Sequence, residues 1–135
     1  MNRMTELKRI MIGGKLFPIK FDINVLEHVQ DEYGTVNEFE RNLRGIEAVR
    51  DEKGNVVYDE KEKPVLFATK EPSVRAIKTA LPAMINEGLA IEAEETGRSW
   101  EPVSELWVLS NCNISFETLS DMIYEEYKRC FEVKK

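Results

Sequence analysis

KRIMIGGKLFPIKFDINVLEHVQDEYGTVNEF, residues 8–39, is the stretch that decides the fold of this chain. Its first part places Gly13-Gly14 between two β-prone runs. The central residues of a two-residue hairpin turn need positive φ angles, which glycine adopts freely. The stretch therefore predicts an N-terminal β-hairpin. We expect its apolar side chains to come from Ile10, Ile12, Leu16, Ile19 and Phe21.

A capped amphipathic helix follows the hairpin. Asp22 is typical of an N-cap, and Gly34 is typical of the residue after a helix C-terminus. The apolar residues between them recur at helical spacing and comprise Ile23, Leu26, Val29 (or Gln30) and Tyr33. Thr35 and Glu38 form a capping box, which predicts a second short helix that ends near Gly45.

The pattern changes between residues 51 and 69, where charges and turn residues separate short β-prone runs. Val56-Val57-Tyr58 and Val65-Leu66-Phe67 are the two runs, and residues 59–64 between them are charged and turn-like. We expect a second short hairpin or a mobile loop here. Because a lone hairpin is marginally stable in water, a hairpin here must dock on the core or on a partner. We identify no internal repeat in this segment or elsewhere.

A central helix is predicted in the second half of the chain. Pro72 and Ser73 favour its start. Pro82 lies inside the run and predicts a kink, and Asn86-Glu87-Gly88 predicts the end of the helix. Its apolar face comprises Val74, Ile77, Leu81, Met84 and Ile85.

Two more helices complete the predicted fold. Pro102 predicts the start of a short helix, and Ser115 caps the final one. The apolar residues of the final helix recur at helical spacing and comprise Phe116, Leu119, Ile123, Tyr127 and Cys130. Together the elements predict a mostly helical α+β fold in one domain, residues 1–135, with the hairpin packed across the helices. The predicted core includes Ile12, Leu16, Phe21, Leu26, Val29, Ile77, Leu81, Leu119 and Ile123.

The composition disfavours several classes of function. The chain has 135 residues, 33% of them charged, and a net charge of −6. Acidic proteins repel phosphate backbones and anionic lipid surfaces, so we expect no nucleic-acid partner and no membrane partner. No apolar run approaches the ~20 residues that span a bilayer, and the first residues, MNRMTELKR, lack the apolar core of a secretory signal. We therefore expect a cytoplasmic protein with reduced cysteines, Cys112 and Cys130.

Residue types that support catalysis are sparse. His28 is the only histidine, and no nucleophile or orienting partner is identifiable beside it. We interpret it as a surface histidine rather than a general base. Gly13-Gly14-Lys15 lacks the rest of a phosphate loop, and Glu92, Glu94 and Glu95 lack the spacing of a cation-binding loop. We expect no enzyme activity, no catalytic residue, no cofactor and no metal site.

Four apolar residues are candidates for binding a partner, namely Trp100, Trp107, Met84 and Ile85. Trp is enriched at protein–protein hot spots, and Met adapts to varied partners. The two tryptophans either help to close the core or form a partner-binding ridge. Met84 and Ile85 belong to the central helix, which is either the wall of a groove or simply the central core helix.

Three segments support a family resemblance. They are IGGKLFPIKFDINVLEHVQDEYGTVNEFE (12–40), EPSVRAIKTALPAMINEG (71–88) and ISFETLSDMIYEEYKRCFEVKK (114–135). They resemble the tail assembly chaperones of long-tailed phages, found in prophages of low-GC Gram-positive bacteria. The resemblance implies a non-enzymatic protein of the host cytoplasm that binds the helical tape measure protein before the tail tube polymerises around it. It offers no motif of binding residues to transfer.

A chaperone of this kind needs a groove for an apolar helix and a charged exterior that keeps the complex soluble. The tail tube protein is a second expected partner. The sequence leaves open whether the chain forms a homo-oligomer. The alternative is a structural tail component, such as a connector or tube-end protein, that remains in the virion. A small enzyme with paired carboxylates is a third hypothesis. An acidic DNA mimic is disfavoured because Lys and Arg are interspersed along the chain.

Overall fold

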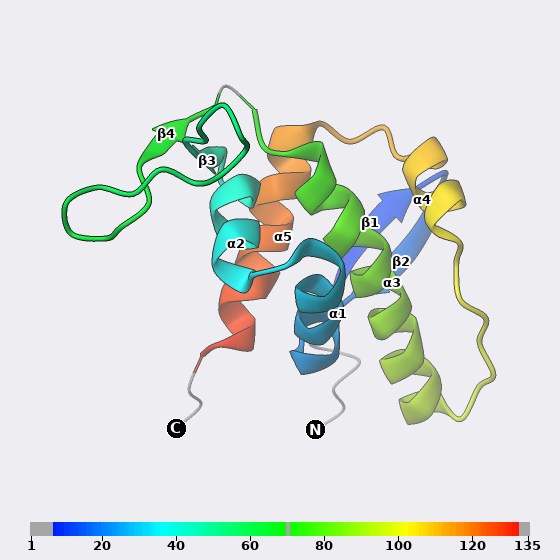
Figure 1. Ribbon diagram of the computed structural model, residues 1–135. Helices are drawn as coiled ribbons and strands as arrows, with labels where there is room; N and C mark the ends of the chain where they lie inside the picture. The colour runs from blue at the N-terminus through cyan, green and yellow to red at the C-terminus, as the bar shows by residue number, and fades with distance from the viewer. Residues whose placement is uncertain (1–6, 70, 133–135) are drawn as a thin grey trace.

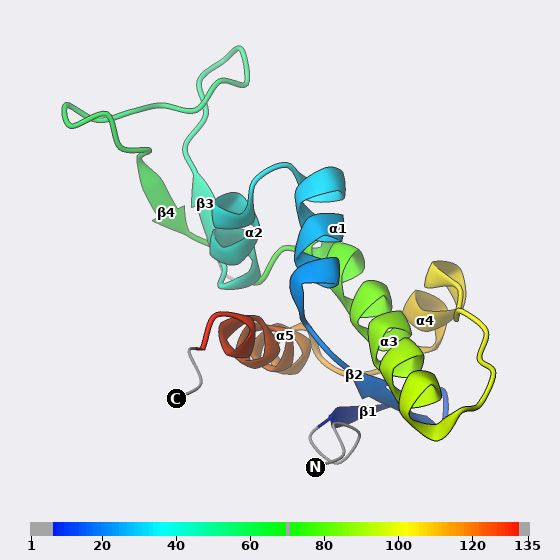
Figure 2. The same cartoon turned by 90° about the horizontal axis from the view of Figure 1, so that it is seen from below.

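The computed structural model describes residues 7–69 and 71–132. Within these residues the chain forms five α-helices and two antiparallel two-stranded hairpins (Figure 1, Figure 2). The elements follow in the order β1 (Lys8–Ile12), β2 (Lys15–Ile19), α1 (Ile23–Tyr33), α2 (Val36–Leu43), β3 (Ile46–Ala48), β4 (Leu66–Ala68), α3 (Val74–Thr96), α4 (Glu105–Asn111) and α5 (Phe116–Cys130). This confirms the predicted mostly helical α+β fold. None of the described helices is long and apolar enough to cross a membrane.

The register of the first hairpin decides which of its residues face the core. Ile10 pairs with Phe17, and Met11 pairs with Leu16. Directly opposed residues of an antiparallel pair point to the same face of the sheet. Ile10 and Phe17 are therefore buried together, whereas Met11 and Leu16 are 51% and 52% exposed. The prediction that Leu16 belongs to the core is wrong, because the two-residue turn assigns it to the outer face.

The predicted caps of α1 and α2 are confirmed. The Asp22 carboxylate accepts a hydrogen bond from the Val25 N–H at 3.2 Å, and Thr35 Oγ1 accepts one from the Glu38 N–H at 3.1 Å. Gly34 ends α1 with a φ angle of 119°. These local signals define the helix ends because each side chain or φ angle satisfies backbone groups that the helix leaves unpaired.

The buried face of α1 differs from the predicted one. Ile23, expected on the apolar face, is 76% exposed, and Leu26 is only partly buried. A helix turns by ~100° per residue, so Ile23 lies ~200° away from the buried Val25. The residues of α1 that are buried are Val25, Val29 and Tyr33.

An aromatic cluster lies at the centre of the core. The Phe21 ring meets Tyr127 edge-on at 5.4 Å, and the Phe39 ring meets Tyr33 and Tyr127 at 5.7 and 5.9 Å. Edge-to-face pairs add about 0.5–1.5 kcal/mol each to the free energy of burial. The remaining predicted core residues that are buried are Ile12, Val29, Ile77, Leu81, Leu119 and Ile123.

The central helix α3 begins where predicted but continues past Gly88 to Thr96. Ser73 is its N-cap, and Gly97 ends it in the left-handed conformation with a φ angle of 69°. Gly88 lies inside the helix, where a Cβ atom would approach the Pro18 carbonyl oxygen to 2.4 Å. The prediction of a helix stop at Gly88 is wrong, because this glycine permits close packing of α3 on β2 instead.

A serine N-cap sets the start of each of the last two helices. Ser104 Oγ accepts a hydrogen bond from the Trp107 N–H at 3.0 Å, so α4 begins at Glu105, three residues after the predicted Pro102. Ser115 Oγ accepts one from the Thr118 N–H at 3.2 Å, which confirms the predicted start of α5. Both starts are set by a hydroxyl that satisfies a free backbone N–H.

Residues 46–68 project from the rest of the molecule and are called the arm; the remaining described residues are called the body (Figure 1, Figure 2). The predicted second hairpin lies in this arm, but its strands have other partners. β4 pairs with β3, whereas residues 56–58 contribute only isolated bridges, one of them between Tyr58 and Pro64. The sequence predicts no strand at β3, because three residues are too few to show a periodic pattern.

Three valines spaced by eight residues organise the arm. The Val57 N–H donates to the Val49 carbonyl, the Val65 N–H donates to the Val57 carbonyl, and the Val49 N–H donates to the Val65 carbonyl. These bonds of 2.8–2.9 Å close a circle that we call the valine ring. The expectation that the chain holds no internal repeat is therefore wrong.

The two loops between these valines are built alike. The carboxylate of Asp51 accepts hydrogen bonds from two backbone N–H groups, and the carboxylate of Asp59, eight residues later, does the same. Gly54 and Glu62 occupy equivalent places with positive φ angles of 83° and 60°. Because glutamate replaces glycine at this position, the repeat is hard to recognise in the sequence.

Candidate functional site

A groove on the body lies between β2, the second half of α3 and the segment that leads to α4. Its cavity volume is about 740 Å³. We call it the Trp100 groove. Its apolar lining comprises Leu16, Phe17, Pro18, Leu89, Trp100, Pro102 and Val103. The rest of its lining is polar and comprises Lys15, Glu92, Ser99 and Glu101. A concave surface that combines apolar side chains with a few polar groups is the usual form of a site that binds another molecule.

Two contacts hold the walls of the Trp100 groove in place. The close approach of Gly88 to Pro18 brings β2 against α3. On the other side, Asn86 Nδ2 donates to the Val103 carbonyl at 3.0 Å, and the Val103 N–H donates to Asn86 Oδ1 at 2.7 Å. This pair of hydrogen bonds fastens the segment after α3 back onto the helix, so the groove keeps its shape without a ligand.

Leu16 and Trp100 give the groove its exposed apolar surface. Leu16 is 52% exposed and Trp100 is 39% exposed. Leu16 faces outward because of the hairpin register, and Trp100 lies between the groove and a smaller hollow of about 240 Å³ that His28 and Glu87 also line. Apolar surface gains ~25 cal/mol per Å² when it leaves water, so a partner that covers both side chains gains free energy.

Charged residues lie at the edge of the same groove. Glu92 and Glu101 line it, and Glu92 accepts a hydrogen bond from Arg9 at 2.6 Å. Lys15 also lines it, with its ammonium group 5.6 Å from the centre of the Phe17 ring. The edge therefore carries both signs of charge around an apolar floor, an arrangement that can receive an amphipathic surface.

The four predicted partner-binding residues lie in different environments. Trp100 lines the groove, as described above. Trp107 is partly buried and packs edge-on against Phe17 at 5.7 Å, so it helps to close the core. Met84 and Ile85 have 0% exposure. The suggestion that Met84 and Ile85 form the wall of a groove needs correction, because their face of α3 is covered by the rest of the core.

The sequence did not indicate the other groove residues. Leu89 lies in a part of α3 that was predicted to be outside the helix, and Pro102 was interpreted as a helix start. Leu16 was assigned to the core, although the Gly13-Gly14 turn determines its outward direction. A strict count of opposed positions from that turn is the signal that identifies Leu16 as exposed.

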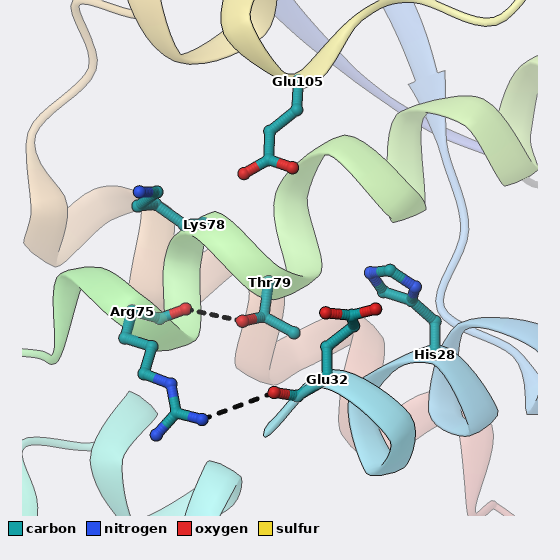
Figure 3. A pocket seen from close by; sticks show the side chains of 6 residues that line it. All are labelled: His28, Glu32, Arg75, Lys78, Thr79 and Glu105. Atoms are coloured by element: carbon teal, nitrogen blue, oxygen red, sulfur yellow. Dashed lines mark hydrogen bonds between the residues drawn. The ribbon is translucent and has the colours of Figure 1, made fainter. Parts of the chain in front are cut away.

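His28 lines a separate, polar hollow of about 440 Å³ with Glu32, Arg75, Lys78, Thr79 and Glu105 (Figure 3). The hydroxyl of Thr79 donates to the Arg75 carbonyl at 2.8 Å. The Arg75 guanidinium donates to the Glu32 carbonyl at 3.3 Å and lies 4.3 Å from the centre of the Tyr33 ring. The two Arg75 interactions join α3 to α1, so the guanidinium serves helix packing, whereas the Thr79 hydroxyl bonds within α3.

Glu87 has the most perturbed carboxyl group near the Trp100 groove. Burial and a hydrogen bond with Asp22 raise the pKa of Glu87 to about 7, against a partly compensating hydrogen bond from Asn24. The Asn24 amide donates to Glu87 Oε2 at 2.7 Å. Across the described ranges, no group of three or more His, Cys, Asp or Glu side chains is arranged to hold a metal ion.

Comparisons of the chain with protein families, with curated proteins and with solved structures found no match.

Proposed function

We propose that this protein is a non-enzymatic assembly chaperone that binds a phage tape measure protein in the host cytoplasm and supports assembly of the tail tube. The observation that best supports this proposal is the Trp100 groove, with Leu16 and Trp100 exposed on its lining. The resemblance of residues 12–40, 71–88 and 114–135 to tail assembly chaperones supplies the identity of the partner.

The groove suits the apolar stripe of an amphipathic helix. Such helices bind by laying residues spaced at i, i+3, i+4 and i+7 into an apolar channel. Trp is a frequent anchor in these interfaces, where a few buried aromatic residues supply most of the binding free energy. Glu101 at the edge favours Lys or Arg beside the stripe, whereas Glu92 is already paired with Arg9 and Lys15 favours an acidic group on the other side.

The charge of the chain serves the same role. A tape measure protein exposes long apolar stripes that associate with one another in water. A bound chaperone with a net charge of −6 covers part of the stripe and adds like-charge repulsion between complexes. The complex therefore stays soluble until the tail tube protein replaces the chaperone.

Co-expression with the cognate tape measure protein tests the proposal. We expect the tape measure protein to be soluble and to co-purify with this chain, also at high salt, since apolar contacts resist screening. Trp100→Ala and Leu16→Asp should each weaken co-purification at least about tenfold, given hot-spot losses of about 2 kcal/mol or more. Leu106→Ala is the matched control, because Leu106 is 77% exposed but does not line the groove.

Two results would overturn the proposal. One is a tape measure protein that fails to co-purify at any salt concentration. The other is recovery of this chain in stoichiometric amount from finished tails, which would assign it to the structural components of the virion. If Trp100→Ala binds the tape measure protein as well as the wild type, the binding surface lies outside the groove. The chaperone role would still stand in that case.

A further inference from the structure

A small hollow adjoins the Trp100 groove. Its volume is about 240 Å³, and residues of α1 and α3 form most of its lining. Trp100 lines both the hollow and the groove, so the two sites share one wall. We call this site the Glu87 hollow, after the carboxyl group that lines it. A partner that occupies the groove can therefore extend a side chain past Trp100 into the hollow.

The lining of the Glu87 hollow suits a long side chain with an apolar stem and a positively charged end. Val25, Ala83 and Ala90 supply apolar surface, Trp100 supplies an aromatic ring, and Glu87 supplies a carboxyl group. Lys and Arg bury their methylene stems on apolar surface, and their charged ends are attracted to aromatic faces and to carboxylates. A single Lys or Arg side chain therefore uses all three features of the lining.

The carboxyl group of Glu87 lacks a positive partner in the folded chain. It forms side-chain hydrogen bonds with Asp22 and with the Asn24 amide, the latter at 2.7 Å. Among the residues that the structure describes, no ion pair joins Glu87 or Asp22 to a Lys, Arg or His. Two adjacent carboxyl groups repel each other once both are ionised. A cation bound in the hollow offsets this repulsion.

The titration of Glu87 is consistent with a missing cation. Burial, followed by the hydrogen bond with Asp22, raises the pKa of Glu87 to about 7. The other titratable groups beside it are Asp22, at the start of α1, and His28, which lines the same hollow. A cation favours the ionised carboxylate, so it lowers the pKa of Glu87 when it binds. The affinity for a cation should therefore be higher at pH 8 than at pH 5.5.

We propose that the Glu87 hollow binds the charged end of a Lys or Arg side chain that the partner carries beside its apolar stripe. The inference rests on the proposed function for the identity of the partner, a tape measure protein. The stripe occupies the Trp100 groove, and the cation enters the hollow on the other side of Trp100. The hollow adds selectivity, because an acidic or uncharged side chain at that place leaves the two carboxyl groups without compensation.

A small cation tests the hollow on the purified chain alone. n-Butylammonium reproduces the stem and the charged end of a lysine side chain. At pH 8 it should cause saturable NMR shifts of the Trp100 indole N–H and the Asn24 side-chain amide, with a Kd of about 10 mM or below. 1-Butanol, its uncharged counterpart, should bind at least about tenfold more weakly, because it gains nothing from the carboxylate.

Two variants separate the hollow from the general charge of the surface. Glu87→Gln should weaken n-butylammonium binding at least about tenfold. Glu27→Gln removes the same charge from an exposed position of α1 that does not line the hollow, and it should bind like the wild type. Circular dichroism checks that both variants are folded.

The dependence on pH gives a second measurement. Binding of n-butylammonium to the wild type should weaken at least about tenfold between pH 8 and pH 5.5, because Glu87 becomes protonated. His28→Gln should keep this dependence, which separates Glu87 from the histidine in the same hollow. A variant His28→Gln whose affinity no longer changes with pH overturns the assignment to Glu87.

The remaining outcomes distinguish this inference from the chaperone proposal. The inference fails alone if n-butylammonium gives no saturable shift up to about 100 mM, or if it binds Glu87→Gln as tightly as the wild type. The chaperone proposal fails alone if n-butylammonium binds through Glu87 but the tape measure protein does not co-purify. In the complex, Glu87→Gln should lower the affinity for the tape measure protein about tenfold. An unchanged affinity overturns the assignment of the cation to that partner.

Discussion

The body and the arm of this protein are held together in different ways. The body surrounds an aromatic cluster and a set of fully buried aliphatic side chains, whereas no residue from 46 to 68 is fully buried. The arm keeps its form through the valine ring and through the carboxylates of Asp51 and Asp59, which bind backbone N–H groups. Burial and local hydrogen bonding thus act as separate sources of order in one chain.

This difference predicts which substitutions should lower the free energy of unfolding most. Apolar truncation in a packed core removes contacts and leaves a cavity, while the same change on a half-exposed strand removes little. The arm is fastened to the body at its base, where Asn42 Nδ2 donates to the Ile46 carbonyl and Arg50 forms an ion pair of 2.9 Å with Glu38. The arm should therefore open locally without unfolding the body.

The largest expected effect is in the body. Leu81 lies in α3 and has 0% exposure, so Leu81→Ala should lower the free energy of unfolding by about 2–5 kcal/mol. Leu66→Ala on the arm removes the same side chain and should cost less than about 0.5 kcal/mol. Urea unfolding of both variants measures the difference. Equal losses would show that the arm belongs to the same cooperative unit as the core.

The contact between α3 and β2 should show the next largest effect. Gly88→Ala adds a methyl group 2.4 Å from the Pro18 carbonyl oxygen, and such overpacking costs about 1–3 kcal/mol despite the better helix propensity of alanine. Lys78→Ala, at an exposed position of the same helix, is the matched control and should stay within about 0.5 kcal/mol of the wild type. Stabilisation by Gly88→Ala in thermal unfolding would contradict the close packing.

A smaller effect should appear as a dependence on pH. The pKa of Glu87 rises from 4.5 to about 7 in the folded chain. The folded state therefore binds more protons than the unfolded state between these values, and its stability falls as pH rises through that window. Glu87→Gln removes this loss of stability. At pH 8 its free energy of unfolding should exceed that of the wild type by about 1 kcal/mol, after allowance for solvent screening.

The comparison for this prediction is made at two pH values. At pH 4 the wild type and Glu87→Gln should have similar free energies of unfolding, because the carboxyl group is protonated in both states. An advantage for the variant that is the same at pH 4 and pH 8 would assign the effect to packing rather than to titration of Glu87.

The smallest effect on stability should come from the arm, where dynamics are the better measure. Amide hydrogens of residues 51–63 should exchange faster than those of α5, because local opening of the arm exposes no core. Val57→Ala should change the unfolding midpoint little, with a loss below about 0.5 kcal/mol. Exchange in the arm as slow as in α5 would refute the distinction between the two regions.

Local signals in the sequence were the most reliable guides to the fold. Asp22, Thr35 and Ser115 cap their helices as predicted, because a cap needs only a side chain and a backbone N–H a few residues away. Gly88 was misjudged because its role depends on β2, a distant strand. The pairing of β3 with β4 also depends on residues far apart in the chain, and no local pattern predicts it.

The candidate site was less predictable than the fold. Residue type alone identifies Trp100, but the groove around it joins residues 15–18 to residues 89–103, which lie more than 60 positions later in the chain. Met84 and Ile85 lie on the same helix as groove residues, but their burial depends on which face of α3 meets the core, and composition does not reveal that face. Sequence patterns thus identify surfaces only where one element supplies the whole surface.

The valine ring makes the length of the arm modular. Each loop begins at one valine of the ring and ends at the next, so each eight-residue block forms one complete loop. We expect removal of one such block to leave the strands at the base in the same alignment, because the Val49 N–H bonds directly to the Val65 carbonyl. A gene that encodes this arm can therefore change its reach by in-frame steps of one block, without redesigning the body that bears it.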